Sequence, residues 1–185
     1  MNLEEKFVRN IKTHKGRIFT FRSDEVLCPN GKLALRDVVD HNGGVCIAPV
    51  TDEGELIFIR QFRYSYEEVL IELPAGKLEI GENADVEAAG RRELEEEVGA
   101  VAGKMTDFGV FYPTCGYCNE KIYLFVATDL TFTEQHLDED EFVEVVRFSL
   151  DEAVKMVMDG TIVDGKSIAL IMKLNEAIKS GDIKI

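Results

Sequence analysis

The stretch GKLEIGENADVEAAGRRELEEEVG, residues 76–99, decides how the rest of the chain is interpreted. Its second half, Val86–Val98, is rich in Ala, Glu, Arg and Leu, which are strong helix formers, and Gly99 follows it. A glycine directly after such a run is a typical stop at the C-terminal end of a helix. The stretch therefore predicts a helix over residues 86–98.

Three glutamates in the last turns of this predicted helix are candidate metal ligands. Glu93 and Glu97 are four residues apart, so they lie on one helix face, and Glu96 flanks the same stripe. Like charges at this spacing repel one another, and the C-terminal end of a helix disfavours anions. A divalent cation between the carboxylates would turn both penalties into an attraction, and clustered hard oxygens suit Mg²⁺ or Mn²⁺ better than zinc. The pattern therefore predicts a metal site that also binds substrate phosphates.

A solvated acidic helix face is the simpler interpretation, but the complete string favours the metal site because it resembles the Nudix box. The pattern is matched by Gly76, by Glu82 after five intervening residues, and by RELEEEVGA at residues 92–100. The departure is the spacer, because nine residues separate Glu82 from Arg92 where the pattern has seven. Two added helical residues would rotate the start of the helix by roughly 200°. We therefore expect a longer loop near residues 83–85 that preserves the helix phase.

The resemblance implies an enzyme of the Nudix family, which hydrolyses diphosphate bonds with Mg²⁺ or Mn²⁺, two or more ions per active site. It also implies that Glu93 and Glu97 are metal ligands, with Glu96 as a third. Arg92 would orient these glutamates through ion pairs, and the carbonyl of Ala75 would reach a metal ion. An ordinary surface ion pair of Arg92, worth under about 1 kcal/mol, is the alternative.

The resemblance extends to the ADP-ribose pyrophosphatase branch of the family. The similar segments are RQFRY, ELPAGK, FYP, EKIYLFVA, DEDEFVEV and, near the N-terminus, KGRIFTFR and ALRDVVDH. They imply hydrolysis of ADP-ribose to AMP and ribose 5-phosphate. They also imply a homodimer that exchanges its N-terminal sheets, so that each active site takes residues from both subunits.

Substrate contacts are expected from several residues of these segments. Arg63 and Arg36 are candidates for phosphate or ribose contacts, because a planar guanidinium suits bidentate phosphate binding. Phe19 or Ile18 would contact the adenine, and Pro113 follows the box as it does in ADP-ribose enzymes. The alternatives are ordinary surface arginines and core positions for Phe19 and Ile18.

The acidic loop His136–Glu141 is the expected source of one further carboxylate. In related enzymes a glutamate of this loop binds a metal ion or deprotonates the attacking water. Glu141 is the first candidate and Glu139 the second, while a merely solvated loop is the alternative.

The remaining segments predict an α/β or α+β fold with a mixed sheet between helices. Residues 1–41 alternate short β-like runs with turns and predict a small antiparallel sheet. The resemblance implies that residues 42–185 form the Nudix hydrolase domain. The apolar runs GVCIAPV and ELIFIRQFRY, joined by residues 52–54, predict a β-hairpin.

Two helices are predicted near the C-terminus. Ser149 and Glu152 form the pattern of a capping box at the start of the first. The second is expected from about residue 166 to 178 and ends near Gly181.

The composition excludes some classes of protein. The formal charge is −14, from 35 acidic and 21 basic residues, which argues against binding of nucleic acid. No run reaches the roughly 18 apolar residues of a membrane span, and the N-terminus has no apolar signal core. We therefore expect a cytoplasmic protein that binds a small nucleoside diphosphate substrate, without a membrane or nucleic-acid partner. No structural disulfide is expected, and Cys46 is expected to be buried.

Other functions stay open on the sequence alone. Cys115 and Cys118 form a CxxC, which suits half a zinc site or a redox pair, although no second CxxC accompanies it. A Nudix domain that senses a nucleotide without hydrolysing it is a second alternative. A third is a Nudix hydrolase of a nucleotide sugar, NADH or an oxidised nucleotide.

Overall fold

The structure is a computed structural model that describes residues 2–79 and 85–183. The chain forms two compact units. The first consists of residues 1–43 with residues 112–121, and the second of residues 44–111 with residues 122–185. Residues 112–121, which the sequence boundary at residue 41 assigned to the hydrolase domain, thus belong with the N-terminal sheet.

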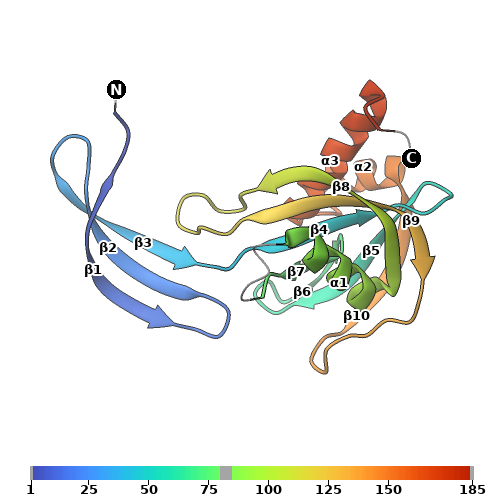
Figure 1. Ribbon diagram of the computed structural model, residues 1–185, viewed down its shortest axis with the longest axis horizontal. Coiled ribbons are helices and arrows are strands. Elements are labelled where there is room, and N and C mark those ends of the chain that lie inside the picture. The colour runs from blue at the N-terminus through green and yellow to red at the C-terminus, as the bar shows by residue number, and fades with distance from the viewer. Residues whose placement is uncertain (1, 80–84, 184–185) are drawn as a thin grey trace. The chain divides into compact units, whose positions relative to one another are not determined.

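The first unit contains an antiparallel sheet with the strand order β1-β2-β3 (Figure 1). Gly31, with a φ of 79°, makes the turn between β2 and β3, a conformation that glycine adopts without strain. Every residue of β1 is exposed, so this sheet has little core of its own. The strands are β1 (Lys6–Lys15), β2 (Thr20–Leu27) and β3 (Leu33–Asp40).

Backbone hydrogen bonds attach residues 112–121 to the end of β3. The Val39 N–H donates to the Tyr117 carbonyl at 2.7 Å, and the Asn119 N–H donates to the Val39 carbonyl at 3.1 Å. The Asn119 side chain also donates to Asp40 at 2.7 Å. These bonds explain why a segment so distant in sequence joins the N-terminal sheet.

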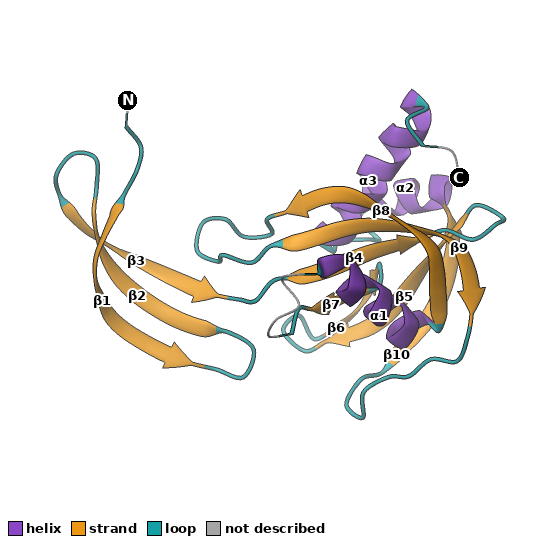
Figure 2. Cartoon of the chain, viewed as in Figure 1, coloured by secondary structure: helices purple, strands orange, loops and turns teal. Residues whose placement is uncertain are grey.

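Two sheets make up the second unit (Figure 2). A four-stranded sheet has the order β7-β4-β9-β8, in which β4 and β9 are parallel and the other pairs are antiparallel. A three-stranded antiparallel sheet has the order β10-β5-β6. The strands are β4 (Gly44–Pro49), β5 (Glu55–Arg63), β6 (Glu68–Glu72), β7 (Ala75–Lys77), β8 (Ala100–Phe111), β9 (Ile122–Phe132) and β10 (Val143–Ser149).

Helices cover both sides of the strands in this unit, as predicted for the α+β class. They are α1 (Val86–Val98), α2 (Leu150–Met158) and α3 (Gly165–Ser180). Because side chains alternate along a strand, Cys46 and Phe58 pack in one buried cluster with α2 and α3. Ile47 and Ile57 pack in a second cluster with α1. Burial of both faces explains the continuous apolar sequences of β4 and β5.

The predicted hairpin of β4 and β5 is wrong. A turn does form, with the Gly54 N–H donating to the Thr51 carbonyl and the Thr51 N–H to the Glu55 carbonyl, each at 2.9 Å. Pairing then stops at the isolated bridge between Val50 and Leu56, and the two strands join different sheets. The reason is that β4 takes β7 and β9 as neighbours and β5 takes β6 and β10.

The three helices form where the sequence predicts them. Asp85 caps α1, and Gly99 ends it in the left-handed conformation. The capping box of Ser149 and Glu152 starts α2, and Gly181 ends α3. Among the described residues, no helix combines the length and the apolar character needed to cross a membrane.

Candidate active site

Glu97 lies in the last turn of α1 and is only 2% exposed. Its Oε2 accepts a hydrogen bond from the Ala75 N–H in β7 at 2.8 Å. Burial raises the pKa of Glu97 to about 8 despite this bond, and the negative charges of Glu141 and Glu93 act in the same direction. The site thus disfavours the carboxylate in the absence of a cation.

Glu93 lies one turn earlier on α1, against the backbone of Gly76. A Cβ at residue 76 would lie 1.9 to 2.2 Å from the atoms of the Glu93 carboxyl group, so a larger residue there would displace this carboxylate. Burial raises the pKa of Glu93 to about 7, although Arg92 lowers it, and Glu96 and Glu141 raise it further.

Arg92 bridges two of the three glutamates. Its Nη2 lies 2.9 Å from Glu93 Oε1, and its Nη1 lies 2.6 Å from Glu96 Oε2. The pairing with Glu96 is the i,i+4 contact expected on a helix surface, whereas the pairing with Glu93 reaches a half-buried carboxylate. Arg92 therefore holds two of the predicted metal ligands by their side chains.

The carboxylates fit a hard divalent cation by their chemistry. Within residues 2–79 and 85–183, no three His, Cys, Asp or Glu side chains converge in metal-binding geometry. However, the raised pKa values of Glu93 and Glu97 mark two acids whose anionic form is disfavoured by burial and by neighbouring carboxylates, although Arg92 pairs with Glu93. Ala75 presents its N–H to Glu97, and Glu82 and the spacer residues 83–84 lie outside the described residues.

The acidic loop after β9 is attached to the C-terminal end of α1. The His136 N–H donates to the Glu96 carbonyl at 3.0 Å, the Gln135 side chain to the Glu97 carbonyl at 2.5 Å, and the Thr133 N–H to the Gly99 carbonyl at 2.6 Å. These bonds satisfy carbonyls that a helix end leaves without intrahelical partners. They also bring the loop close to the glutamates of α1.

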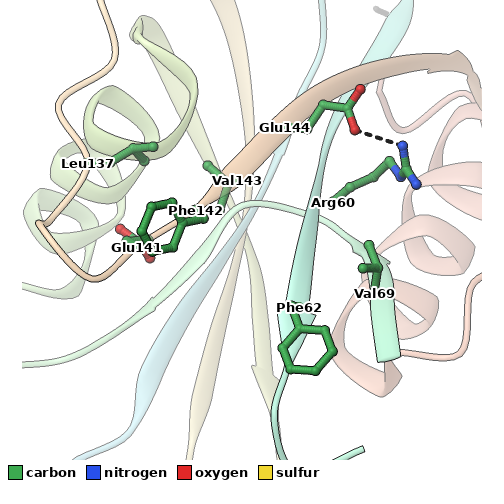
Figure 3. Close-up of a pocket in the computed structure, with 8 residues that line it drawn as sticks. All are labelled: Arg60, Phe62, Val69, Leu137, Glu141, Phe142, Val143 and Glu144. Carbon is green, nitrogen blue, oxygen red and sulfur yellow. Dashed lines mark hydrogen bonds and ion pairs between the residues drawn. The ribbon is translucent and has the colours of Figure 1, made fainter. Parts of the chain in front are cut away.

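Glu141 and Glu139 differ in their placement on this loop. The charge of Glu141 raises the pKa values of Glu93 and Glu97, so it acts on the same site. Glu141 also lines a pocket, whereas Glu139 is exposed and is not among the residues lining it. The pocket, drawn in Figure 3, is open to solvent and is lined by Arg60, Phe62, Val69, Leu137, Glu141, Phe142, Val143 and Glu144.

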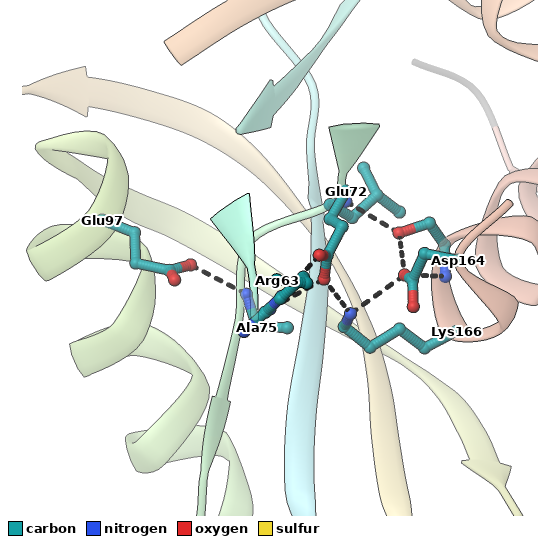
Figure 4. Close-up of polar contacts among 8 residues, drawn as sticks. Arg63, Glu72, Ala75, Glu97, Asp164 and Lys166 are labelled. Atoms are coloured by element: carbon teal, nitrogen blue, oxygen red, sulfur yellow. Dashed lines mark hydrogen bonds and ion pairs between the residues drawn. The ribbon is translucent and has the colours of Figure 1, made fainter. Parts of the chain in front are cut away.

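Arg63 does not present a free guanidinium. Its Nε and Nη2 donate to the two carboxylate oxygens of Glu72 at 2.6 and 2.8 Å, a bidentate ion pair shown in Figure 4. Its positive charge nevertheless lowers the pKa of Glu97, so Arg63 lies within electrostatic range of the glutamates of α1.

The other predicted substrate contacts lie in the first unit. Arg36 pairs with Glu5, with Nε and Oε2 2.9 Å apart. Phe19 and Ile18 are 47% and 59% exposed, so the alternative that they are core residues of this chain does not hold. Pro113 is exposed in the segment attached to β3.

Two charged residues beside this site escaped the sequence analysis. Glu72 is 2% exposed, and Lys166 at the start of α3 pairs with it. In the sequence, Glu72 stands out only as part of the string ELPAGK, and Lys166 only as the expected start of a helix. Their proximity depends on how β6 and α3 pack, which no local pattern reports.

Comparisons with known proteins extend over nearly the whole chain. A model of the NUDIX domain matches residues 40–170. The ADP-ribose pyrophosphatase of Bacillus subtilis (strain 168) is 39% identical over 183 residues, covering 97% of this chain and 98% of that protein. The methanol dehydrogenase activator of Bacillus methanolicus is 37% identical over 180 residues, covering 95% and 96%.

A solved structure has the same fold. It is described as the crystal structure of an ADP compounds hydrolase, and it matches with a TM-score of 0.86 and 25% identity over 98% of each chain. The family model, the relatives and this fold agree with the resemblance found in residues 76–100. The chain therefore belongs to the Nudix family.

Proposed function

We propose that this chain is a Nudix pyrophosphohydrolase that cleaves ADP-ribose to AMP and ribose 5-phosphate. The observation that carries the proposal is the pair of acids at the end of α1, the half-buried Glu93 and the buried Glu97, whose pKa values are raised to about 7 and about 8. Carboxylates held out of water in this way suit a site that binds divalent cations together with the phosphates of a substrate. The similarity to an ADP-ribose pyrophosphatase over 97% of the chain supports the choice of substrate.

Mg²⁺ or Mn²⁺, two or more ions per site, is the proposed cofactor, held by Glu93, Glu96 and Glu97. When bound, these ions supply positive charge that offsets the charge of the diphosphate and makes water more acidic. The backbone carbonyl of Ala75 remains a further proposed ligand, since the same residue already places its N–H on Glu97. Arg92 keeps Glu93 and Glu96 oriented through the two ion pairs described above.

Glu141 is the proposed general base, with Glu139 as the second candidate. It takes a proton from the water that attacks one phosphorus of the diphosphate. The bond from that phosphorus to the bridging oxygen breaks, and the bridging oxygen leaves with the other phosphate, which gives one phosphate monoester on each side. Support for Glu141 comes from its electrostatic effect on Glu93 and Glu97.

Arg63 is the proposed contact to the substrate phosphates from within the second unit. Arg36, Phe19 and Pro113 would contribute to binding from the first unit. These three contacts depend on the proposed homodimer, in which the N-terminal sheet of one subunit contributes to the active site of the other.

The homodimer is supported by the exposed apolar side chains of the first unit. On β1, Phe7 is 64% exposed and Ile11 49%, and on β3, Leu33 and Leu35 are 59% and 60% exposed. A three-stranded sheet that leaves this much apolar surface in water is expected to be covered by another chain. A cytoplasmic location also belongs to this proposal.

A substrate panel tests the activity directly. The purified protein is mixed with Mg²⁺ and, separately, with ADP-ribose, a nucleotide sugar, NADH and an oxidised nucleoside triphosphate. We expect AMP and ribose 5-phosphate from ADP-ribose at the highest kcat/KM, and no turnover in EDTA. Faster cleavage of another compound would assign that compound as the substrate. Binding of ADP-ribose without cleavage would indicate a nucleotide sensor.

A further inference from the structure

Four charged side chains meet between β5, β6 and the start of α3 (Figure 4). Glu72 binds Arg63 through both of its oxygens, and its Oε2 also lies 2.5 Å from Lys166 Nζ. Lys166 Nζ lies 2.9 Å from Asp164 Oδ2 as well. The cluster holds two cations and two anions, and Lys166 is the residue that joins both carboxylates.

The same cluster connects α3 to the segment after β6. Asp164 caps α3 by accepting bonds from the Ser167 N–H at 3.1 Å and the Ser167 hydroxyl at 2.5 Å. The Ser167 oxygen in turn accepts the Leu73 N–H at 2.8 Å. The start of α3 therefore holds the backbone that follows Glu72.

Both ends of this connection reach the proposed active site. Ala75, three residues after Glu72, donates its N–H to Glu97. Arg63, the proposed contact to the substrate phosphates, is bound to Glu72 by two hydrogen bonds. A change in the position of Glu72 would therefore move a proposed phosphate contact and a backbone donor at the same time.

Stability alone is a weak reason for such a cluster. Taking charges out of water costs several kcal/mol per ion, and a buried ion pair is often no better for stability than apolar residues of the same volume. Lys166 has a side chain that is only 13% exposed, so it bears this desolvation cost. A role in geometry explains the cluster better.

We propose that Lys166 is a positioning residue for the reaction: by holding Glu72, it orients Arg63 toward the substrate phosphates and keeps Ala75 against Glu97. The inference rests on the proposed function. Lys166 itself touches neither the substrate nor the glutamates of α1 in this scheme. It acts through Glu72.

Two substitutions of Lys166 separate charge from volume. Lys166→Met removes the cation and keeps an unbranched side chain. We expect kcat/KM for ADP-ribose to fall roughly 10- to 100-fold, because a displaced binding group lowers the rate by about this factor. Lys166→Arg keeps the cation, and we expect it to recover most of the activity. Equal activity of the wild type and Lys166→Met would overturn the proposal.

A double-mutant cycle distinguishes positioning from general destabilisation. If Lys166 acts through Glu72, the variant with both Glu72→Gln and Lys166→Met loses no more kcat/KM than Glu72→Gln alone. The double variant removes one anion and one cation together and so keeps the net charge of the cluster, and it serves if Lys166→Met alone does not fold. Losses that simply multiply would contradict the route through Glu72.

An NMR measurement decides the point without relying on turnover. The Nε–H signal of Arg63, identified by its loss in Arg63→Lys, is expected to be ordered in the wild type and mobile in Lys166→Met. Arg60 lies on β5 like Arg63, and it pairs with Glu144 of β10 at 2.7 Å. Its Nε–H signal is the internal control and is expected to be the same in both proteins. A rigid Arg63 in Lys166→Met overturns the positioning role, whereas a wild type that leaves ADP-ribose intact overturns the proposed function alone.

Discussion

Glu97 is an acid that is both buried and held by a backbone hydrogen bond. It is buried in the core behind α1, and it accepts the Ala75 N–H as a carboxylate would. A pKa of about 8 means that the metal-free protein holds much of this residue in its neutral form at neutral pH. Bound cations would restore the anion, which couples the protonation of Glu97 to metal binding.

Replacing this one carboxylate tests the site most directly. We expect Glu97→Gln to lower kcat by at least about 100-fold while the protein stays folded, because an amide fills the buried position without a charge. Glu95→Gln is the matched control, since Glu95 lies on the exposed face of the same helix. Steady-state kinetics with saturating Mg²⁺, together with circular dichroism, make the comparison. Near-normal turnover by Glu97→Gln would contradict the proposal that α1 carries the metal site.

The general base is tested by a second matched pair. Glu141→Gln is expected to lower kcat by about 10²- to 10⁴-fold with little change in KM, as loss of a general base does. Glu139→Gln, two residues away and exposed, is expected to retain activity. The reverse ranking of the two variants would assign the base to Glu139.

At the scale of elements, α1 brings together acids that would repel one another in water. Burial raises the pKa values of both Glu93 and Glu97 above their ordinary value of 4.5. The folded state therefore keeps protons that the unfolded state has already released. The stability linked to these protons is fully present below pH 4.5 and is lost as the pH rises through the folded values of about 7 and 8.

This linkage predicts a pH dependence of the metal-free protein. In EDTA, the free energy of unfolding is expected to decrease between about pH 5 and pH 8.5, and less steeply in Glu97→Gln. Urea unfolding curves across this range measure both slopes. Adding Mg²⁺ is expected to restore stability at the upper end of the range, because the bound cation favours the ionised carboxylates. Identical slopes for the two proteins would contradict the raised pKa of Glu97.

The C-terminal end of α1 is a second element-level feature, because it holds the loop that carries Glu141. Gly99 has a φ of 66°, and a Cβ there would lie 2.7 Å from the Thr133 oxygen. Gly181 ends α3 with a similar φ of 81°, but no atom lies within 4 Å of its added Cβ.

These two glycines give a controlled comparison. Gly181→Ala is expected to cost about 1–2 kcal/mol of stability, the penalty of the left-handed conformation alone. Gly99→Ala is expected to cost about 1–3 kcal/mol more because of the clash, and to lower kcat by displacing the loop. Denaturant unfolding and kinetics on both variants measure the difference. Equal effects of the two substitutions would show that the loop does not depend on this contact.

At the scale of the whole molecule, the first unit lacks the buried surface that the second unit has. Sedimentation velocity at micromolar concentration is expected to show two chains per particle. Leu35→Lys, on the exposed apolar surface of β3, is expected to shift the protein toward the monomer and to weaken ADP-ribose binding. Met158→Lys is the control, because Met158 is an exposed apolar residue of the second unit, 75% exposed. A monomeric wild type would exclude the exchanged dimer.

Local patterns were sufficient for the helices and for the side of α1 on which the proposed metal ligands lie. Spacing along a helix places Glu93, Glu96 and Glu97 on one side whatever α1 packs against, and Gly99 ends α1 by its own conformational freedom. The same local character explains why the sequence predicts the N-terminal capping box of α2 and the end of α3 near Gly181. These features depend on neighbours within a few residues, so the sequence alone determined them.

The tertiary structure alone decided which distant segments meet. It separated β4 from β5 although a tight turn joins them, and it attached residues 112–121 to the N-terminal sheet. It also turned Arg63 from a free cation into the partner of Glu72 and brought Lys166 to the same place. The physical reason is that sheet pairing and buried ion pairs are chosen by the packing of the whole core, which leaves no periodic signal in the chain.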